Sequence, residues 1–441
     1  MRILIYVPTI TFDSCVGNSV HVRELAQNLL ELGNEVVVIA NLSNSAYDGI
    51  VAVRSTKIPR IGVLGWLIAQ IQALFLVILE TAKNKCQLVY TRFGFSSGPC
   101  LLMARLTGIP SVIEVNGFPR DEAKVSRVRL WGKITGYLTN WISDTACRYA
   151  QQVIAVTPRI KEVLVAEYGI ETDKITGYLT NWVSDTACRY AQQVIAVSPQ
   201  IKEVLVATLS IKPEKIAMIS NGANTDLFKP MDTNLARRQL NLSGADYFVT
   251  FVGMLAAWQG VEYLIRSALY ILEECPESKF VIVGDGPMKQ GLIKLAKEVG
   301  ASERVAFTGR VPYDKVPLYI NASDICAAPF IRERNERSGV SPLKIYEYGA
   351  CGKAIVTSRL PGLEFIEQYD TGVLIQPDNA KELARAIMRL LQNPELKKQM
   401  GENGRKFVVE NHSWESVAKR VAELCEQTLH EHEKKRNKGK P

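Results

Sequence analysis

Residues 338–364 decide the fold, and they read SGVSPLKIYEYGACGKAIVTSRLPGLE. Pro342 is a residue type that is favoured in the first turn of a helix. The turns after it have an apolar side and a polar side, with Lys344 and Glu347 on the polar one. Glycines then end the helix before residues 354–357, Ala-Ile-Val-Thr, which read as a short buried strand. The stretch therefore predicts a helix that begins at a polar loop and leads into a buried strand.

The start of this helix suits a phosphorylated ligand. A helix N-terminus offers free N–H groups and a partial positive charge, and Lys344 adds a full charge. An ionised Glu347, one turn later, can only accept hydrogen bonds, so it suits the hydroxyl groups of a ribose or another sugar. A surface helix with an ordinary i,i+3 Lys–Glu pair has the same spacing, and spacing alone does not choose between the two.

The composition indicates a globular, intracellular protein. A chain of 441 residues is too long for one hydrophobic core, so we expect two domains. Nine cysteines, without a C-x-x-C pair, argue against a disulfide framework and against a zinc site, which fits a reducing cytoplasm. The first residues, MRILIYVP, run straight into a strand, so we expect no signal peptide.

Much of the net charge of +8 lies at the end of the chain. Residues 430–441 hold five Lys or Arg against two Glu. We expect this tail to be disordered, either solvated or in contact with an anionic membrane. We expect no nucleic-acid partner.

The N-terminal half opens as a βαβ unit. Residues 2–7 read as a strand, a loop of small residues follows, a helix comes next, and residues 35–40 read as a second strand. Parallel sheets bind ligands at the carboxyl ends of their strands, so the loop around Gly17 is a candidate binding loop, although the G-x-G-x-x-G fingerprint is absent. His21 is either a residue of the helix face or a substrate contact.

Residues 61–79 contain no charged residue over a length of about 28 Å as a helix. Three readings remain open for this segment: a membrane span, a helix that lies in the membrane interface, and a buried helix.

A polar stretch follows the predicted strand at residues 111–115. Because polar residues at the end of a strand point into the ligand crevice, Glu114, Asn116 and Asp121 are candidates for a ligand-binding site. A plain turn is the alternative.

A block of the N-terminal half occurs twice. Residues 133–170 and 174–211 are offset by 41 positions and differ at six pairs of residues. Each copy is expected to hold a helix, a strand, a proline and a second helix. Two copies are too few for a solenoid. Either copy could be extruded from the sheet, or the additional strand could extend its edge.

The C-terminal half reads as a second βα series. A turn-rich crossing at residues 221–230 precedes it, and predicted strands end in glycine-containing turns at residues 253–260, 284–287 and 309–312. No D-x-D pair occurs in the chain, so we expect no divalent metal bound by such a pair and no cofactor.

The chain resembles the retaining glycosyltransferases of family 4, which have the two-domain GT-B fold. The resemblance is carried by Asn221–Pro230, Gly284–Pro287 and Ser341–Glu347, and a subgroup of the family is similar in its Ser-Pro-Leu-Lys run. The family has two Glu residues separated by seven others. Glu347 matches the second, which holds the ribose, whereas Gly339 stands at the place of the first.

The resemblance implies roles for particular residues. Many relatives carry Arg and Lys in the loop at residues 253–260, where this chain has Met254 and Gln259, so Lys344 and Arg337 are expected to supply the missing charge. Lys344, Glu347 and Asn116 are the implied catalytic residues, Asn116 standing where relatives place a His. The implied donor-binding residues are Gly17, Gly253, Gln259, Gly284, Arg310, Val311, Ser341, Pro342, Leu343, Lys344 and Glu347, and the acceptor-side residues are His21, Glu114, Asn116 and Asp121.

The sequence thus predicts an α/β protein with two Rossmann-like domains that face each other across a cleft. We expect an acceptor-side domain at 1–222, a nucleotide-sugar domain at 223–405, a helix that crosses back at 406–428 and a tail at 429–441.

The expected activity is transfer of a hexosyl group from a nucleotide-diphosphate sugar to a glycan or polyprenyl-linked acceptor. The enzyme would work in cell-surface polysaccharide synthesis, in the cytoplasm or at the inner face of the membrane. A catalytically impaired nucleotide-sugar-binding paralogue and a GT-B epimerase or phosphorylase are the alternatives.

Overall fold

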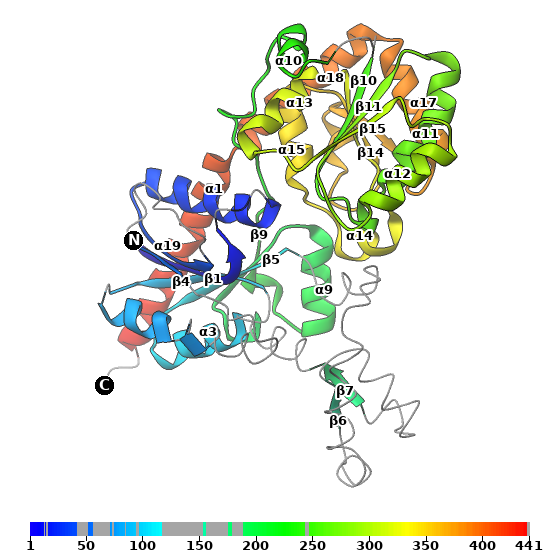
Figure 1. The fold of residues 1–441 in the computed structure, drawn as a ribbon. Coiled ribbons are helices and arrows are strands. Elements are labelled where there is room, and N and C mark those ends of the chain that lie inside the picture. The colour runs from blue at the N-terminus through cyan, green and yellow to red at the C-terminus, as the bar shows by residue number, and fades with distance from the viewer. Residues whose placement is uncertain are drawn as a thin grey trace.

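The computed structural model describes residues 1–12, 14, 16–41, 52–55, 71–72, 75–83, 85–93, 97–116, 153–155, 175–178, 188–242 and 247–438. These residues form two lobes, each built on a parallel sheet with helices on both faces (Figure 1). The expectation of two Rossmann-like units is confirmed. Asp121 and Lys133–Gln152 lie outside the described residues.

The first sheet contains the N-terminal strands in the order β3-β2-β1-β4-β5-β8-β9, with neighbouring strands parallel. Its strands are β1 (Arg2–Thr11), β2 (Glu35–Asn41), β3 (Ala52–Ser55), β4 (Leu88–Arg92), β5 (Ser111–Val115), β8 (Gln193–Ala196) and β9 (Ile216–Met218). The apolar runs predicted β1, β2 and β5, because strands covered on both faces need apolar side chains on both sides.

The alternation of side chains along β1 assigns the helices to the two faces of this sheet. Its odd-numbered apolar residues pack with α1 (Gly17–Glu31) and with α19 (Trp414–Lys438). Its even-numbered ones pack with the helix at residues 75–83 and with α3 (Ser97–Leu106). Because α1 follows the carboxyl end of β1 in the chain, the start of α1 lies at the carboxyl edge of the sheet.

The second copy of the duplicated block supplies the strand of the main sheet. Strand β8 and the following α9 (Pro199–Leu209) come from this copy, and β8 lies between β5 and β9. In the first copy, β6 (Val153–Ala155) pairs instead with β7 (Ile175–Tyr178) in a separate two-stranded sheet, drawn below the main lobes in Figure 1. Residues 175–178, at the start of the second copy, therefore form a strand, which Ile, Thr and Tyr favour.

The second sheet has the strand order β12-β11-β10-β13-β14-β15, and its neighbouring strands are also parallel. Its strands are β10 (Phe248–Val252), β11 (Lys279–Val283), β12 (Val305–Gly309), β13 (Ile325–Ala328), β14 (Ile355–Ser358) and β15 (Gly372–Ile375). Strand β10 occupies the middle, so the loop after it lies centrally at the carboxyl edge.

Helices cover both faces of the second sheet. One face packs on α11 (Val261–Glu274), α12 (Lys289–Glu298) and α17 (Ala380–Leu391). The other packs on α13 (Val316–Ala322), α15 (Leu343–Ala350) and the end of α18 (Pro394–Asn411). The shorter helices are α10 (Thr233–Gln239), α14 (Arg332–Ser338) and α16 (Phe365–Gln368).

The chain returns to the first lobe at its end, and two of the expected boundaries there are wrong. Helix α18 continues through residue 406 to Asn411, so the crossing helix is α19, which begins at Trp414. The residues from 429 to 438 continue α19 instead of forming a disordered tail. They are rich in Glu, Lys and Arg, which are good helix formers and can extend a helix that is anchored by the buried Trp414.

Among the described residues, no helix is both long enough and apolar enough to pass through a bilayer. Most of the apolar segment at 61–79 lies outside these residues. The part that is described includes the beginning of the helix at residues 75–83.

Candidate functional site

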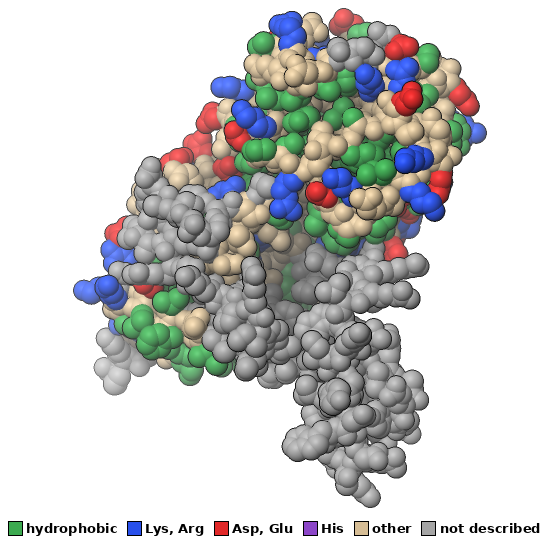
Figure 2. Space-filling view, in the orientation of Figure 1, with side chains coloured by type: hydrophobic (Ala, Val, Ile, Leu, Met, Phe, Trp, Pro, Cys, Tyr) green, Lys and Arg blue, Asp and Glu red, His purple; other side chains and the backbone are tan. Residues whose placement is uncertain are grey.

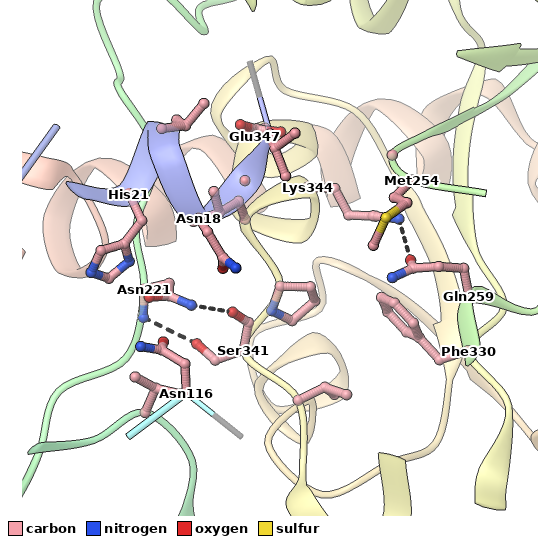
Figure 3. A pocket seen from close by; sticks show the side chains of 18 of the residues that line it. Asn18, His21, Asn116, Asn221, Met254, Gln259, Phe330, Ser341, Lys344 and Glu347 are labelled. Atoms are coloured by element: carbon pink, nitrogen blue, oxygen red, sulfur yellow. Dashed lines mark hydrogen bonds between the residues drawn. The ribbon is translucent and has the colours of Figure 1, made fainter. Parts of the chain in front are cut away.

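A cleft of about 400 Å³ lies between the two lobes. One wall comes from the start of α1 and from the ends of β4 and β5, and the other comes from the loop after β10, from α14 and from the start of α15. In Figure 3, His21 and Asn116 lie on one side of this space, and Lys344, Gln259 and Met254 lie on the other. The carboxyl edges of both sheets therefore meet at the cleft, which is where parallel α/β sheets bind ligands.

Lys344 places a buried cation in the C-terminal wall. The residue is 8% exposed, and its Nζ donates to Oε1 of Gln259 at 2.6 Å and lies 3.8 Å from the ring centroid of Phe251. No ion pair joins it to a carboxylate in the part of the chain that the structure describes. Burial lowers the pKa of Lys344 to about 7. An anion that entered the cleft would therefore favour the charged form of this lysine.

Two glycines allow the loop after β10 to lie against this ammonium group. Gly253 has a φ of +144°, and a Cβ atom there would come within 2.5 Å of Nζ of Lys344. A Cβ atom on Gly284 would lie 1.8 Å from the carbonyl oxygen of Gly253. Gly253 requires glycine because of its positive φ, and Gly284 requires it because backbone atoms of Gly253 occupy the space of a side chain.

Glu347 is buried one turn after Lys344, and α15 begins without a side-chain cap on its first N–H groups. Burial raises the pKa of Glu347 to about 7. Tyr313 lines the same part of the cleft. The combination offers a cation, a carboxyl group and free helix N–H groups within one helical segment.

The raised pKa of Glu347 makes the stability of the ligand-free protein depend on pH. Between about pH 4.5 and 7, the folded state holds a proton on Glu347 that the unfolded state has lost, so this group's contribution to stability falls as pH rises. We expect Glu347→Gln to gain up to about 3 kcal/mol relative to the wild type between pH 4.5 and 7.5. Melting temperatures of both proteins across this range test it, and a constant difference would contradict it.

A second cation, Arg334 of α14, lies against the same loop. Its guanidinium group is 5.1 Å from the ring centroid of Trp258, and the neighbouring Asn335 donates from Nδ2 to the Trp258 carbonyl at 2.9 Å. Arg334 therefore contacts residue 258 of the loop while Lys344 contacts residue 259. The loop at residues 253–260, which has no charged residue of its own, receives two cations from α14 and α15.

The N-terminal wall contains a group of polar side chains around Glu114. His21, Arg92 and Asn116 line the cleft, and all three contact the carboxylate of Glu114. Burial would raise the pKa of Glu114, but His21 and Arg92 hold it well below its usual range. Glu114 itself is not among the residues that line the cleft.

Direct hydrogen bonds join the two lobes at the base of the cleft. The backbone N–H of Asn221 donates to Oγ of Ser341 at 3.0 Å, and its side-chain amide donates to the Ser341 carbonyl (Figure 3). These bonds connect the crossing segment to the residue that precedes Pro342 and α15. They place the start of α15 relative to the first sheet.

Gly339 lies where α14 meets the first lobe. Its φ of +60° and ψ of 179° belong to a region that is essentially restricted to glycine. A Cβ atom there would lie 2.7 Å from Oε1 of Gln200 and 2.8 Å from Oγ of Ser198. Both neighbours belong to α9 or its N-cap, so the second copy of the duplicated block forms this contact.

The structure brings most of the predicted site residues together. The cleft is lined by Gly17, His21, Asn116, Gly253, Gln259, Ser341, Pro342, Leu343, Lys344 and Glu347. Four other predicted residues do not line it: Glu114, Gly284, Arg310 and Val311. Asp121 and the side chain of Arg337 lie outside the described residues.

The sequence did not single out several residues that line the cleft. Asn18, Arg92, Trp258 and Arg334 are among them. Arg334 lies one helical turn before Arg337. The charged run at residues 332–337 therefore indicated a cation in this region, but it did not indicate which arginine faces the cleft. In the described part of the chain, no group of three or more His, Cys, Asp or Glu side chains could hold a metal ion.

Comparisons with known proteins match both halves of the chain. A family model described as glycosyl transferases group 1 matches residues 232–407, and one described as glycosyltransferase family 4 matches residues 17–177 and 176–227. The chain is 28% identical over 325 residues to alpha-D-kanosaminyltransferase of Streptomyces kanamyceticus, covering 73% of this chain and 71% of that one.

A second relative covers less of its own length. The chain is 30% identical over 207 residues to the GDP-mannose-dependent alpha-(1-6)-phosphatidylinositol monomannoside mannosyltransferase of Mycolicibacterium smegmatis. This match covers 46% of this chain, which spans about half the length of that relative (54%).

Solved structures share the arrangement of both lobes. Sucrose-phosphate synthase from Thermosynechococcus elongatus matches with a TM-score of 0.72 at 20% identity, covering 98% of this chain and 100% of that one. HepE of Anabaena in complex with UDP matches with a TM-score of 0.66 at 17% identity, covering 97% of this chain and 100% of that one. At these identities the structures show the fold alone, while the two family models together span residues 17–407 apart from residues 228–231. The protein is thus a glycosyltransferase of the GT-B fold that is similar to family 4.

Proposed function

We propose that the protein is a retaining enzyme that transfers a hexosyl group from a nucleotide-diphosphate sugar to a glycan or lipid-linked acceptor in cell-surface polysaccharide synthesis. The observation that carries the proposal is the buried pair of Lys344 and Glu347 at the start of α15, in the cleft between the lobes. A cation and a carboxyl group one turn apart suit a diphosphate and a ribose, respectively.

Two cations would bind the diphosphate. Lys344 and Arg334 contact consecutive residues of the loop at 253–260, and the uncapped start of α15 lies beside them. These groups would supply the positive charge that the loop lacks, and the backbone at Gly253 would allow the diphosphate to approach the loop closely.

The transferred sugar would lie toward Asn116 and His21 on the opposite wall. The bond between the sugar's anomeric carbon and the diphosphate breaks as the bond to the acceptor oxygen forms on the same face, and the departing phosphate takes the acceptor's proton. Lys344 and Arg334 would stabilise the negative charge that develops on the diphosphate. This route needs no protein nucleophile and no metal.

The relatives support a nucleotide sugar without fixing which one. The name of the Mycolicibacterium smegmatis relative specifies GDP-mannose, whereas HepE of Anabaena was solved with UDP and also with UDP-glucose. The proposal of a glycan or lipid-linked acceptor rests on the family resemblance and on the membrane contact proposed below.

Nucleotide binding and turnover test the proposal directly. Nucleoside diphosphates and then their sugars are added to the protein, and the matching nucleotide should raise the melting temperature by mass action. We expect Glu347→Ala to weaken nucleotide binding about 10- to 100-fold, which is the worth of charge-assisted hydrogen bonds to the ribose. Unchanged affinity in Glu347→Ala would remove this site from the proposal.

The two alternatives predict different results in the same assay. Nucleotide binding without transfer to any glycan or lipid-linked acceptor would favour the catalytically impaired paralogue. Conversion of the nucleotide sugar without an acceptor would favour an epimerase, and conversion that requires inorganic phosphate would favour a phosphorylase.

We also propose that the first lobe contacts an anionic membrane. The helix at residues 75–83 and α3 cover the same face of the first sheet, and both present exposed apolar side chains to solvent (Figure 2). These side chains belong to Phe75, Ile78, Leu79, Leu102 and Leu106. Exposed basic residues lie beside them at Lys83, Lys85 and Arg105. Apolar side chains ringed by cations suit the surface of an anionic bilayer.

Sedimentation with liposomes tests this contact. The wild type should sediment with vesicles that contain anionic lipid, and Phe75→Glu with Leu106→Glu should release it because both side chains would leave the apolar layer. If the double variant stays bound and high salt alone releases it, the basic end of α19 carries the contact instead.

A further inference from the structure

The carboxylate of Glu114 is buried, and each of its oxygens contacts two donor groups. Oε1 forms an ion pair with Nε of Arg92 at 3.1 Å and accepts a hydrogen bond from the side-chain amide of Asn116. Oε2 lies 2.9 Å from Nε2 of His21 and accepts from the hydroxyl of Tyr90. A carboxylate has about four lone-pair sites, and four groups of the protein surround this one.

Three of the four partners line the cleft, but Glu114 does not. His21 comes from α1, Arg92 from the end of β4, and Asn116 from the residue after β5. Arg92 also donates from Nη1 to the backbone carbonyl of Asn18 at 3.3 Å, which extends the set to the start of α1. One buried side chain thus determines where three separate segments of the N-terminal wall place their polar groups.

Glu114 has no free position with which to bind a substrate. It is 3% exposed, and its oxygens already have their full number of partners. Neighbouring positive groups keep it ionised, so its contacts are charge-assisted and hold their donors more firmly than neutral hydrogen bonds would.

We infer that Glu114 is a positioning residue of the reaction, which sets the side-chain orientation of Asn116 and His21 toward the transferred sugar and the acceptor. The inference rests on the proposed function and assigns to Glu114 a role other than acceptor contact. Because catalysis depends on placement to within about 1 Å, a small displacement of this carboxylate should affect turnover more than donor binding.

The experiment compares two changes at Glu114 in the full-length protein. Glu114→Asp keeps the charge but withdraws the carboxylate by one methylene, and we expect at least a tenfold lower kcat with an unchanged Kd for the nucleoside diphosphate. Glu114→Gln keeps the length and retains an oxygen for Arg92 and Asn116, because its amide can turn its NH2 group toward His21 and Tyr90. Because it removes the charge that pairs with Arg92, we expect it to lower kcat as well, but less than Glu114→Asp does.

A double-mutant cycle with Asn116→Ala separates positioning from a general structural effect. If Glu114 acts through Asn116, Asn116→Ala should lower kcat in the wild type and cause a clearly smaller further loss in Glu114→Asp. Asp324→Asn is the matched control, since Asp324 accepts from Arg237, Lys397 and the Phe248 amide away from the cleft. It should lower the melting temperature without changing kcat.

The possible outcomes are distinct. Wild-type kcat in Glu114→Asp, or fully independent losses in the cycle, would overturn the inference. Unfolding of both Glu114 variants would also overturn it, because Glu114 would then be a stability residue. Absence of turnover by the wild type with every nucleotide sugar would instead count against the proposed function.

Discussion

Lys344→Met is expected to lower turnover at least about 100-fold while weakening nucleotide binding much less. Removing a group that stabilises charge developing in a transition state typically costs a factor of 10²–10³ in kcat. Methionine has a similar length and suits the aromatic surroundings of Phe251 and Phe330, over whose rings the lysine Nζ now lies, so we expect the variant to fold. The measurements are kcat with the cognate nucleotide sugar and Kd for the nucleoside diphosphate.

A matched control and a rescue make this result specific. Lys353 is also a mostly buried lysine, but its Nζ donates to Thr233 and to the carbonyls of Asn321 and Ser323, away from the cleft. Lys353→Met should lower the melting temperature and leave kcat unchanged. Adding Gln259→Lys to Lys344→Met returns a cation to the partner position and should restore part of the turnover. Equal kcat for Lys344→Met and the wild type would exclude Lys344 from the chemistry.

Gly339→Glu, which introduces the first glutamate of the family pattern, is expected to destabilise the protein by about 3 kcal/mol or more. Backbone strain at this φ and ψ costs roughly 1–3 kcal/mol for a residue other than glycine, and overpacking adds a similar amount. A Cβ atom would meet Gln200, Ser198 and the carbonyl of Pro361. We also expect lower turnover, because the loop before α15 would move away from α9.

Gly291→Glu is the control for this change. Gly291 lies in α12 with nothing within 4 Å of a Cβ atom, so the same substitution should be neutral or slightly stabilising there. Chemical unfolding of both variants provides the comparison. If Gly339→Glu proved as stable as the wild type and more active, the departure from the family pattern would be a loss of function rather than a consequence of the fold.

The sequence predicted the elements of the fold well where burial alone decides them. Residues 111–115 were predicted as a strand and form β5, and the helix predicted after Pro342 forms α15. Such elements carry their own pattern, because strands covered on both faces need apolar runs and a helix against a core needs an apolar stripe. Boundaries were less predictable, as the start of α19 and the helical tail show.

The candidate site likewise contains residues that the sequence could predict and residues that it could not. Lys344 and Glu347 could be predicted because they share one helix, whose spacing and start are local properties. Arg334 against Trp258 could not be predicted, and neither could the contacts of Glu114 with His21, Tyr90 and Arg92, because these partners come from segments that are separate in the sequence. The contacts exist only once the sheets have been assembled.

By itself, the sequence determined that this chain forms two parallel α/β units and that the helix after Pro342 carries a cation and a carboxyl group at its start. Only the tertiary structure decided which copy of the duplicated block enters the first sheet, since the two copies are nearly identical. It also decided that residue 339 lies against α9 in a conformation restricted to glycine. The physical reason is that hydrophobic periodicity is a local property of the chain, whereas strand choice, close approach and shared hydrogen-bond partners depend on segments that meet only in the folded protein.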